Sequence, residues 1–523
     1  MLMCLSNIGF ALVPAVNAQA SVTNLMLPGA SVQLDSTVYV PATVPAPAVL
    51  LAHGWAGNKT NMAGQARELQ AAGYLVLAWT ARGFGNSTGY IELNSPQAEV
   101  ADVSRLIDYL AGRGDVTMDG SGDPRVGISG GSYGGAVSIM AAGLDPRVDA
   151  VAANITWNDL QQSLFPQFAV GVENSGVLKK SQAAGLFAAA QSAVPGSDCG
   201  RIEPTWCAEY KSSMNTGVPS AALSRLLHAS SPAAYAADVT APTLLMQGQA
   251  DSLFDLSESL RTAQQICSAN SDNKVAMLWH LSGHSATANA ATSAENSRTG
   301  AATKRWFDIH LRGVPADFAT FQVTRANGTA VFPDGSLVPT LYSTESLPIT
   351  AKTLDYALPR TVSTLSTSGV TSVSWTGVAL TTSTWLLGSP LLRIRVASTS
   401  GDAMLFFSTL IKRATGASVK PQGLVAPIRL SNIPAGGTDV LVQLPAVSVV
   451  AAPGDSLAVS ATVIEPGYDS AATARTYTVT PLSALAVPSL QFQPEVTQLS
   501  AVRFPAARRT RPPAGCAALA ALR

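Results

Sequence analysis

Residues 127–135, with the sequence Gly-Ile-Ser-Gly-Gly-Ser-Tyr-Gly-Gly, decide the fold of this 523-residue chain. They contain two overlapping copies of the pattern G-x-S-x-G, one centred on Ser129 and one on Ser132. In this pattern a serine occupies a sharp turn between a strand and a helix, so the residues two positions away must be tiny. Residues 125–129 are typical of a strand and residues 136–144 of a helix, which favours the copy centred on Ser132.

The copy centred on Ser129 would shorten the strand and place glycines in the first turns of the helix, where each costs about 1 kcal/mol relative to alanine. We therefore predict that Ser132 is a catalytic nucleophile on a strand–turn–helix elbow. The alternative for this segment is a glycine-rich turn without a catalytic role.

Short apolar runs alternate with helical sequence on both sides of this turn. Strands are expected at residues 48–52, 74–79, 125–129, 148–154, 243–247 and 274–280. Helices are expected at residues 61–72, 96–110, 136–144 and 301–311. This alternation predicts an α/β fold, a doubly wound and mostly parallel sheet with helices on both faces. Residues 156–240 interrupt it with sequence rich in Ala, Ser and Gln, which predicts a helical cap inserted over the carboxyl edge of the sheet.

The character of the sequence changes after residue 315. Residues 316–500 are rich in Thr, Ser and Val, with frequent Gly and Pro and little helical periodicity. Residues 392–396, Leu-Arg-Ile-Arg-Val, alternate strictly between apolar and polar, as a half-buried strand does. Several such segments at spacings of about 8–12 residues predict a C-terminal all-β sandwich of the jelly-roll type. The preceding residues 21–315 form the predicted catalytic domain.

Both ends of the chain differ from the rest. Residues 1–20 hold a short apolar stretch followed by Ala18-Gln19-Ala20, a small-x-small cleavage site. They predict a signal peptide, and hence a secreted or periplasmic protein; a buried N-terminal strand is the alternative. Residues 501–523 are rich in Arg and predict a disordered tail, with binding to an acidic partner as the alternative.

Charge and composition exclude several classes of protein. Lys and Arg together number 33, as do Asp and Glu, so no net field attracts nucleic acid or an anionic membrane. The hydrophobic content of 47% excludes a largely disordered chain, and no apolar run approaches the ~18–20 residues of a membrane span. Because no cysteines have the paired spacing of a zinc site, we expect neither a metal nor a cofactor. The oligomeric state stays open.

Two of the cysteines are close in the sequence. Cys199 and Cys207 bracket a short loop that contains Gly200 and Pro204. In an oxidising compartment they could close a small disulfide ring, and two free thiols are the alternative.

A serine hydroxyl becomes a nucleophile when a base takes its proton and an acid orients that base. In this fold the acid and then the histidine follow the serine along the chain. His284 lies in a Ser-Gly-His-Ser loop just past strand 274–280 and is the expected base, with His280 as the alternative. Asp251 lies about four residues past strand 243–247 and is the expected acid. Its alternative role is a helix N-cap.

The oxyanion of the transition state needs donors that are held in place beforehand. One is expected to be the backbone N–H of Tyr133, directly after the nucleophile. The other is expected from the loop after strand 48–52, His-Gly-Trp-Ala-Gly at residues 53–57, where the N–H of Trp55 is best placed. His53 itself is expected to be structural.

The order of these motifs resembles the α/β-hydrolases. The Ser-Tyr-Gly-Gly at the nucleophile, the cap and the trailing sandwich are similar to the X-prolyl dipeptidyl-peptidase/cocaine-esterase (CocE/NonD acyl esterase) family. Two further segments resemble the same family, Thr-Trp-Asn-Asp-Leu at residues 156–160 and Leu-Gly-Ser-Pro-Leu at residues 387–391. The resemblance spans about residues 30–490 and implies an acyl hydrolase. Some members are thought to use a tyrosine hydroxyl in the oxyanion hole. Because this chain has Trp55 in its place, the resemblance implies an oxyanion hole made of two backbone N–H groups.

The leading hypothesis is a serine hydrolase that cleaves a small ester or peptide through an acyl-enzyme, either an acyl esterase or an X-Pro dipeptidyl-peptidase. A dipeptidyl-peptidase must bind a free substrate ammonium, which requires an acidic side chain near the pocket. The candidates in or beside the cap are Asp159, Glu173, Asp198, Glu203 and Glu209. The alternative from another class is a non-catalytic protein that binds a polymer such as a carbohydrate on an inert hydrolase scaffold.

Overall fold

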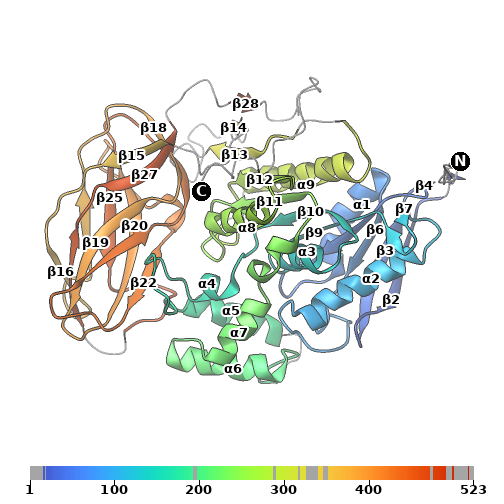
Figure 1. Ribbon diagram of the computed structural model, residues 1–523, viewed down its shortest axis with the longest axis horizontal. Helices are drawn as coiled ribbons and strands as arrows, with labels where there is room; N and C mark the ends of the chain where they lie inside the picture. Colours follow the sequence, from blue (N-terminus) through green and yellow to red (C-terminus); the bar gives the residue numbers. More distant parts are fainter. Residues whose placement is uncertain are drawn as a thin grey trace, which may run out of the picture.

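The computed structural model of the protein describes residues 16–17, 19–192, 197–286, 290–315, 318–325, 340–344, 352–471, 475–490, 497–499 and 516. Most of the predicted signal peptide and of the predicted tail lies outside these residues. An α/β part and an all-β part lie side by side, with the helices of residues 160–229 below the α/β part in Figure 1. Within the described residues, no helix has the length and apolar character needed to cross a membrane.

Eleven strands of the described residues form one mixed sheet, in the order β2-β3-β6-β5-β9-β10-β11-β12-β13-β14-β28. Neighbours from β6 to β13 in this order are parallel, and the pairs at both edges are antiparallel. Their bounds are β2 (Ser21–Pro28), β3 (Gln33–Val40), β5 (Ala48–Ala52), β6 (Leu75–Trp79), β9 (Val126–Gly131), β10 (Val148–Asn154), β11 (Thr243–Gly248), β12 (Val275–His280), β13 (Phe321–Arg325), β14 (Thr340–Thr344) and β28 (Thr497–Leu499). The expected mostly parallel α/β sheet is therefore present.

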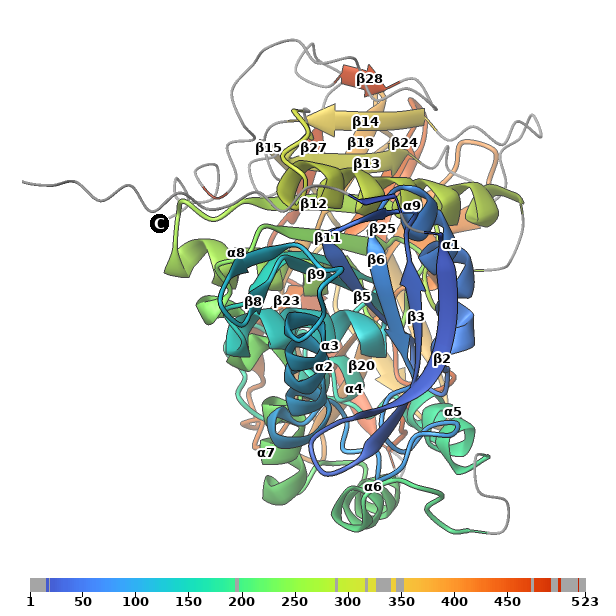
Figure 2. The same cartoon turned by 90° about the vertical axis from the view of Figure 1, so that its right-hand side faces the viewer.

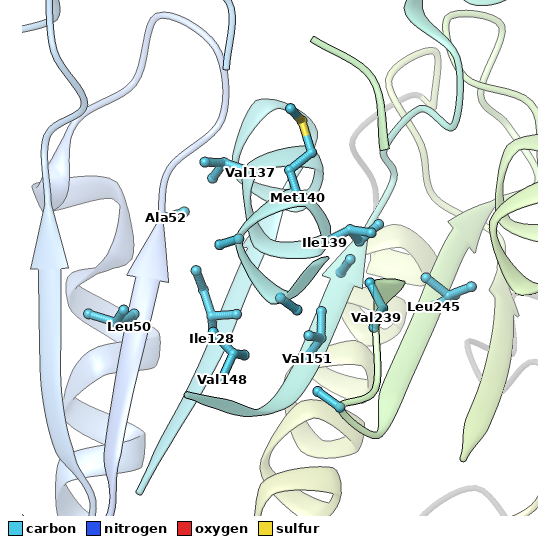
Figure 3. Close-up of a cluster of buried hydrophobic side chains, with 14 of the residues drawn as sticks. Leu50, Ala52, Ile128, Val137, Ile139, Met140, Val148, Val151, Val239 and Leu245 are labelled. Atoms are coloured by element: carbon cyan, nitrogen blue, oxygen red, sulfur yellow. The ribbon is translucent and has the colours of Figure 1, made fainter. Parts of the chain in front are cut away.

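Helices cover both faces of this sheet (Figure 2). On one face lie α2 (Ala101–Ala111), α3 (Tyr133–Leu144) and α8 (Leu256–Ala269), and on the other lie α1 (Ala63–Ala71) and α9 (Ala290–His310). Strands buried on both faces read as continuous apolar runs, which is why the sequence revealed them. Figure 3 shows part of the core, where Leu50, Ile128 and Val151 of adjacent strands lie beside Val137 and Ile139 of α3.

The segment between β10 and β11 is helical, as predicted for residues 156–240. It holds α4 (Leu160–Leu164), α5 (Lys180–Gln191), α6 (Pro204–Thr216) and α7 (Ala221–Ala229). Apolar side chains of these helices form one buried cluster with Tyr133, the first residue of α3, and Phe254, which lies in the loop after β11. Cys199 and Cys207 form a disulfide at the start of α6. The cap is thus packed directly on the edge where the elbow lies.

Among the described residues, the C-terminal part holds two antiparallel sheets, one of eight strands and one of five. Their bounds are β15 (Lys352–Tyr356), β16 (Ser363–Ser366), β17 (Ser372–Thr376), β18 (Thr384–Gly388), β19 (Leu391–Ser398), β20 (Ala403–Lys412), β21 (Ser418–Val419), β22 (Ala426–Leu430), β23 (Thr438–Gln443), β24 (Val447–Ala451), β25 (Ser456–Thr462), β26 (Thr476–Pro481) and β27 (Leu485–Leu490). Leu392 and Ile394 of β19 share a buried core with Leu405 and Phe407 of β20. The all-β sandwich is confirmed, while the jelly-roll connection stays a prediction.

The expected boundary at residue 315 is wrong for the central sheet. β13, β14 and β28 lie beyond it, yet they extend this sheet rather than the sandwich. Phe321 of β13 is fully buried and packs edge to face on Trp279 of β12, with ring centroids 5.1 Å apart. The residues of β13 alternate between apolar and polar as those of a sandwich strand do. Such a pattern does not specify which sheet a strand joins.

Two further features differ from the sequence expectation. Helix α9 begins at Ala290 rather than near residue 301. The sequence did not indicate its first turns, because they are polar and carry little apolar periodicity. Cys267 of α8 forms a disulfide with Cys516, although the two are 249 residues apart. Cys516 belongs to the segment predicted to be a disordered tail, and it is fully buried against the core.

Candidate active site

Ser132 occupies a strained turn between β9 and α3, with φ 56° and ψ −119°. A side chain on Gly130 would place its Cβ 2.5 Å from the backbone of Gly134, and one on Gly134 would overlap the carbonyl oxygen of Ala52. The two glycines are therefore required for α3 to start this close to β9 and β5. Ser129 lies inside β9 and is only 4% exposed. Strain of this kind persists only where the surrounding structure fixes it, and it concentrates at functional sites.

The three side chains selected from the sequence lie together. His284 Nε2 is 2.9 Å from Ser132 Oγ, and His284 Nδ1 is 2.7 Å from Asp251 Oδ2. The tautomer with its proton on Nδ1 donates to Asp251 and leaves Nε2 to accept from the serine hydroxyl. Three loops at the carboxyl ends of β9, β11 and β12 thus converge on one point.

Asp251 is fully buried, and both of its oxygens accept hydrogen bonds. Oδ1 accepts from the backbone N–H groups of Leu253 at 3.0 Å and Phe254 at 2.8 Å. Oδ2 accepts from the backbone N–H of His284 at 3.2 Å in addition to its ring. These bonds compensate the burial of a carboxylate. The N-cap of α8 is Asp255, which accepts from Ser257 N–H, so the alternative role for Asp251 is wrong.

His280 and His53 differ from His284, because both ring nitrogens of each contact groups other than Ser132. His280 contacts Asn154 Oδ1 at 2.8 Å and Ser282 Oγ at 2.6 Å, and burial lowers its pKa to about 3. His53 contacts the carbonyl of Gly54 and accepts from the backbone N–H of Ala81, and burial lowers its pKa to about 4. Both rings hold backbone and side chains in place, so His280 does not take the position expected of the base.

The loop that carries Trp55 contacts the elbow. A Cβ on Gly54 would lie 3.8 Å from the Cβ of Ser132, and the indole of Trp55 meets the ring of Tyr133 edge to face at 5.3 Å. In the part of the chain that the structure describes, the backbone N–H groups of Trp55 and Tyr133 donate to no protein acceptor. They are therefore available to a bound oxyanion.

A cavity of about 110 Å³ opens beside Ser132 beneath the cap. Its walls are apolar and come chiefly from α4–α7 and from the loops after β10 and β11, with Trp157, Leu186, Phe187, Trp206, Leu223 and Phe254 among them. No acidic or basic side chain of the described residues lines it. The sequence did not reveal this cavity, because its wall is assembled from several short segments, each of which reads as ordinary core.

The acidic candidates for binding a substrate ammonium lie elsewhere. Asp159 and Glu203 cap the starts of α4 and α6, and Glu209 accepts from the hydroxyl of Ser220. Asp198 is an exposed partner of Lys211, and Glu173 lines a separate groove against the sandwich. None of these carboxylates lines the cavity beside Ser132.

A sequence model of the X-Pro dipeptidyl-peptidase (S15) family matches residues 29–286. The fold is similar to a CocE/NonD family hydrolase from Staphylococcus aureus, with 14% identity, 91% of this chain and 97% of that chain covered, and a TM-score of 0.66. It is similar to an aminopeptidase from the marine sediment archaeon Thaumarchaeota archaeon, with 14% identity, coverage of 93% and 99%, and a TM-score of 0.65.

An α-amino acid ester hydrolase also has a similar structure, with 15% identity, coverage of 92% and 99%, and a TM-score of 0.61. No curated protein sequence matches this chain. At these identities the structural likeness shows the fold, and it extends over nearly the whole of each chain.

Proposed function

The chain belongs to the X-Pro dipeptidyl-peptidase (S15) family and is a serine hydrolase of the ester or peptide type, and we propose that it is a secreted esterase for neutral, apolar acyl groups. The observation that carries this proposal is the apolar cavity beside Ser132, which no acidic side chain of the described residues lines. Labelling of the protein by a fluorophosphonate tests the hydrolase mechanism, and a pair of matched esters tests the acyl group.

In the proposed mechanism, Ser132 Oγ attacks the ester carbonyl while His284 Nε2 takes the hydroxyl proton. Asp251 stabilises the resulting imidazolium, and the oxyanion accepts from the N–H groups of Trp55 and Tyr133. The carbonyl re-forms, the bond to the leaving oxygen breaks, and that oxygen takes the proton from His284 to leave as the alcohol. A water then attacks the acyl-enzyme with His284 again as base. The bond between the acyl carbon and Ser132 Oγ breaks, Oγ takes the proton back from His284, and the acid product departs.

The apolar cavity argues against a peptide substrate with a free amino terminus. A charged ammonium that leaves water for an apolar site without a partner loses several kcal/mol. The carboxylates that could pair with it cap helices or face solvent. A neutral acyl group instead gains from burial against Trp157 and Phe254. This difference supports an esterase over an X-Pro dipeptidyl-peptidase.

We expect methyl 3-phenylpropionate to be hydrolysed with a kcat/KM at least about 100-fold higher than that of phenylalanine methyl ester, since the two differ only in the ammonium group. Initial rates of both esters, measured at one pH low enough to keep the amino ester protonated, give the ratio. X-Pro-p-nitroanilides with a free amine are expected to be poor substrates. A preference for the charged ester, or efficient cleavage of the X-Pro anilides, would contradict the proposed acyl group.

Secretion is supported by the disulfides Cys199–Cys207 and Cys267–Cys516, because such bonds persist in oxidising compartments. The other cysteine lies within the predicted signal peptide, residues 1–20. We expect the exported protein to begin at residue 21 and to show no titratable thiol after denaturation without reductant. N-terminal sequencing and thiol titration check both points. Retention in the cytoplasm with residues 1–20 intact and four free thiols in the remainder of the chain would contradict the proposal.

A further inference from the structure

Tyr133 is held at two points besides its backbone neighbours. Its phenol is buried and donates to Glu99 Oε1 at 2.9 Å. Its carbonyl oxygen accepts from Asn94 Nδ2, also at 2.9 Å. The N–H of the same residue is one of the two proposed oxyanion donors. The position of this donor therefore depends on the segment 92–99, which no part of the proposed mechanism uses so far.

Glu99 connects this segment to Tyr133. It lies in the short helical segment η2 (Pro96–Val100) and is 3% exposed. Its Oε1 also accepts from the backbone N–H of Glu92 at 2.7 Å, and its Oε2 accepts from the backbone N–H of Ser95 at 3.0 Å. One buried carboxylate thus fixes both the loop 92–95 and the phenol of Tyr133.

The loop needs this fixation because its backbone is strained. Leu93 and Asn94 have φ values of 56° and 62°, in the left-handed region that side-chain-bearing residues rarely adopt. Asn94 is also buried, and it directs its amide to Tyr133 from this conformation. The strained loop and the elbow are therefore coupled through Glu99.

The second proposed donor is linked to the same unit. The rings of Tyr133 and Trp55 meet edge to face at 5.3 Å, and both also contact Phe84. Trp55 Nε1 donates to the carbonyl of Leu186 in α5 at 2.7 Å, and Leu186 lines the cavity. A shift of the Tyr133 ring would therefore be passed to Trp55.

We propose that Glu99 is a positioning residue for the oxyanion hole, which holds Tyr133 through its phenol so that the backbone N–H groups of Tyr133 and Trp55 stay in place for the oxyanion. The inference rests on the proposed serine hydrolase mechanism and adds a residue to it. Glu99 contacts neither Ser132 nor His284, so its effect is exerted through Tyr133.

The test compares Glu99→Gln and Tyr133→Phe with the wild-type enzyme. The first keeps the size of the side chain but replaces one acceptor oxygen by a donor, and the second removes only the phenol oxygen. For both we expect kcat on a neutral ester to fall about tenfold to a hundredfold with KM changed less than about twofold, because the lost interaction acts mainly in the transition state. The inhibition constant of a trifluoromethyl ketone with the same acyl group is expected to rise by the same factor.

The matched control is Asp149→Asn. Asp149 is a carboxylate that is partly buried, and burial raises its pKa to about 6. Like Glu99, it accepts from a backbone N–H, that of Val126 at 2.7 Å. Because Val126 begins β9, this carboxylate lies at the opposite end of the strand from the elbow. The control variant is expected to keep the wild-type kcat and inhibition constant.

The inference is overturned if both variants keep the wild-type kcat, or if their loss lies in KM with an unchanged inhibition constant for the ketone. If Glu99→Gln does not fold, Tyr133→Phe decides alone, since it removes a single atom from an intact ring. A wild-type protein that no fluorophosphonate labels would instead overturn the proposed function. The two failures are therefore distinguishable.

Discussion

Replacing Ser132 with alanine is expected to abolish labelling by a fluorophosphonate probe and to lower kcat on esters by about 10⁵–10⁶-fold. The physical reason is that no other hydroxyl of the described residues contacts His284 Nε2: Ser132 Oγ lies 2.9 Å from it, whereas Ser129 lies inside β9. The residual rate would come from the two proposed oxyanion donors and the cavity proposed to bind the acyl group. In-gel fluorescence and steady-state rates measure the two losses.

Ser129→Ala is the matched control and is expected to keep both labelling and rate. Trypsin releases both serines in one peptide, residues 126–147, so the adduct on the wild-type protein must be located by fragmentation. A label on Ser129, or full labelling of the Ser132→Ala protein, would show that the assignment of the nucleophile is wrong.

The sequence was most informative where structure is decided by neighbours along the chain. The glycines around Ser132 are required by contacts within a few residues and with one adjacent strand, so the local pattern was enough to select this serine. Asp251 and His284 were selected because they follow apolar strands, and parallel strands bring their carboxyl ends to one edge of a sheet. The structure places His284 within hydrogen-bonding distance of both Ser132 and Asp251.

The sequence was less informative where distant segments meet. The strand alternation of β13 could not show that it pairs with β12. Cys267 and Cys516 are brought to a Cα–Cα distance of 4.8 Å only by the folded chain. Glu99 follows a proline at the start of a helix, where a carboxylate is ordinarily exposed, and only its contacts with Tyr133 and the loop 92–95 reveal its burial.

The pair of Asp251 and His284 is expected to give the second large effect. Asp251→Asn should lower kcat about 10⁴-fold and His284→Ala about 10⁵–10⁶-fold, with KM little changed in both. Asp251 Oδ2 lies 2.7 Å from His284 Nδ1, and in the proposed mechanism it stabilises the imidazolium, whereas His284 moves the proton itself. An asparagine keeps the shape of the acid but loses its charge, so the imidazolium forms less readily.

The two changes should not be additive, because the acid acts only through the histidine. The double variant is therefore expected to be no slower than His284→Ala alone, which separates a catalytic pair from two residues that each support the fold. Asp255→Asn is the matched control for the acid, since Asp255 caps α8 and asparagine caps helices equally well. Its kcat should equal that of the wild type. If His280→Gln were inactive while His284→Ala kept its activity, the base would be the buried histidine of β12, and the proton path drawn from Ser132 to His284 would be wrong.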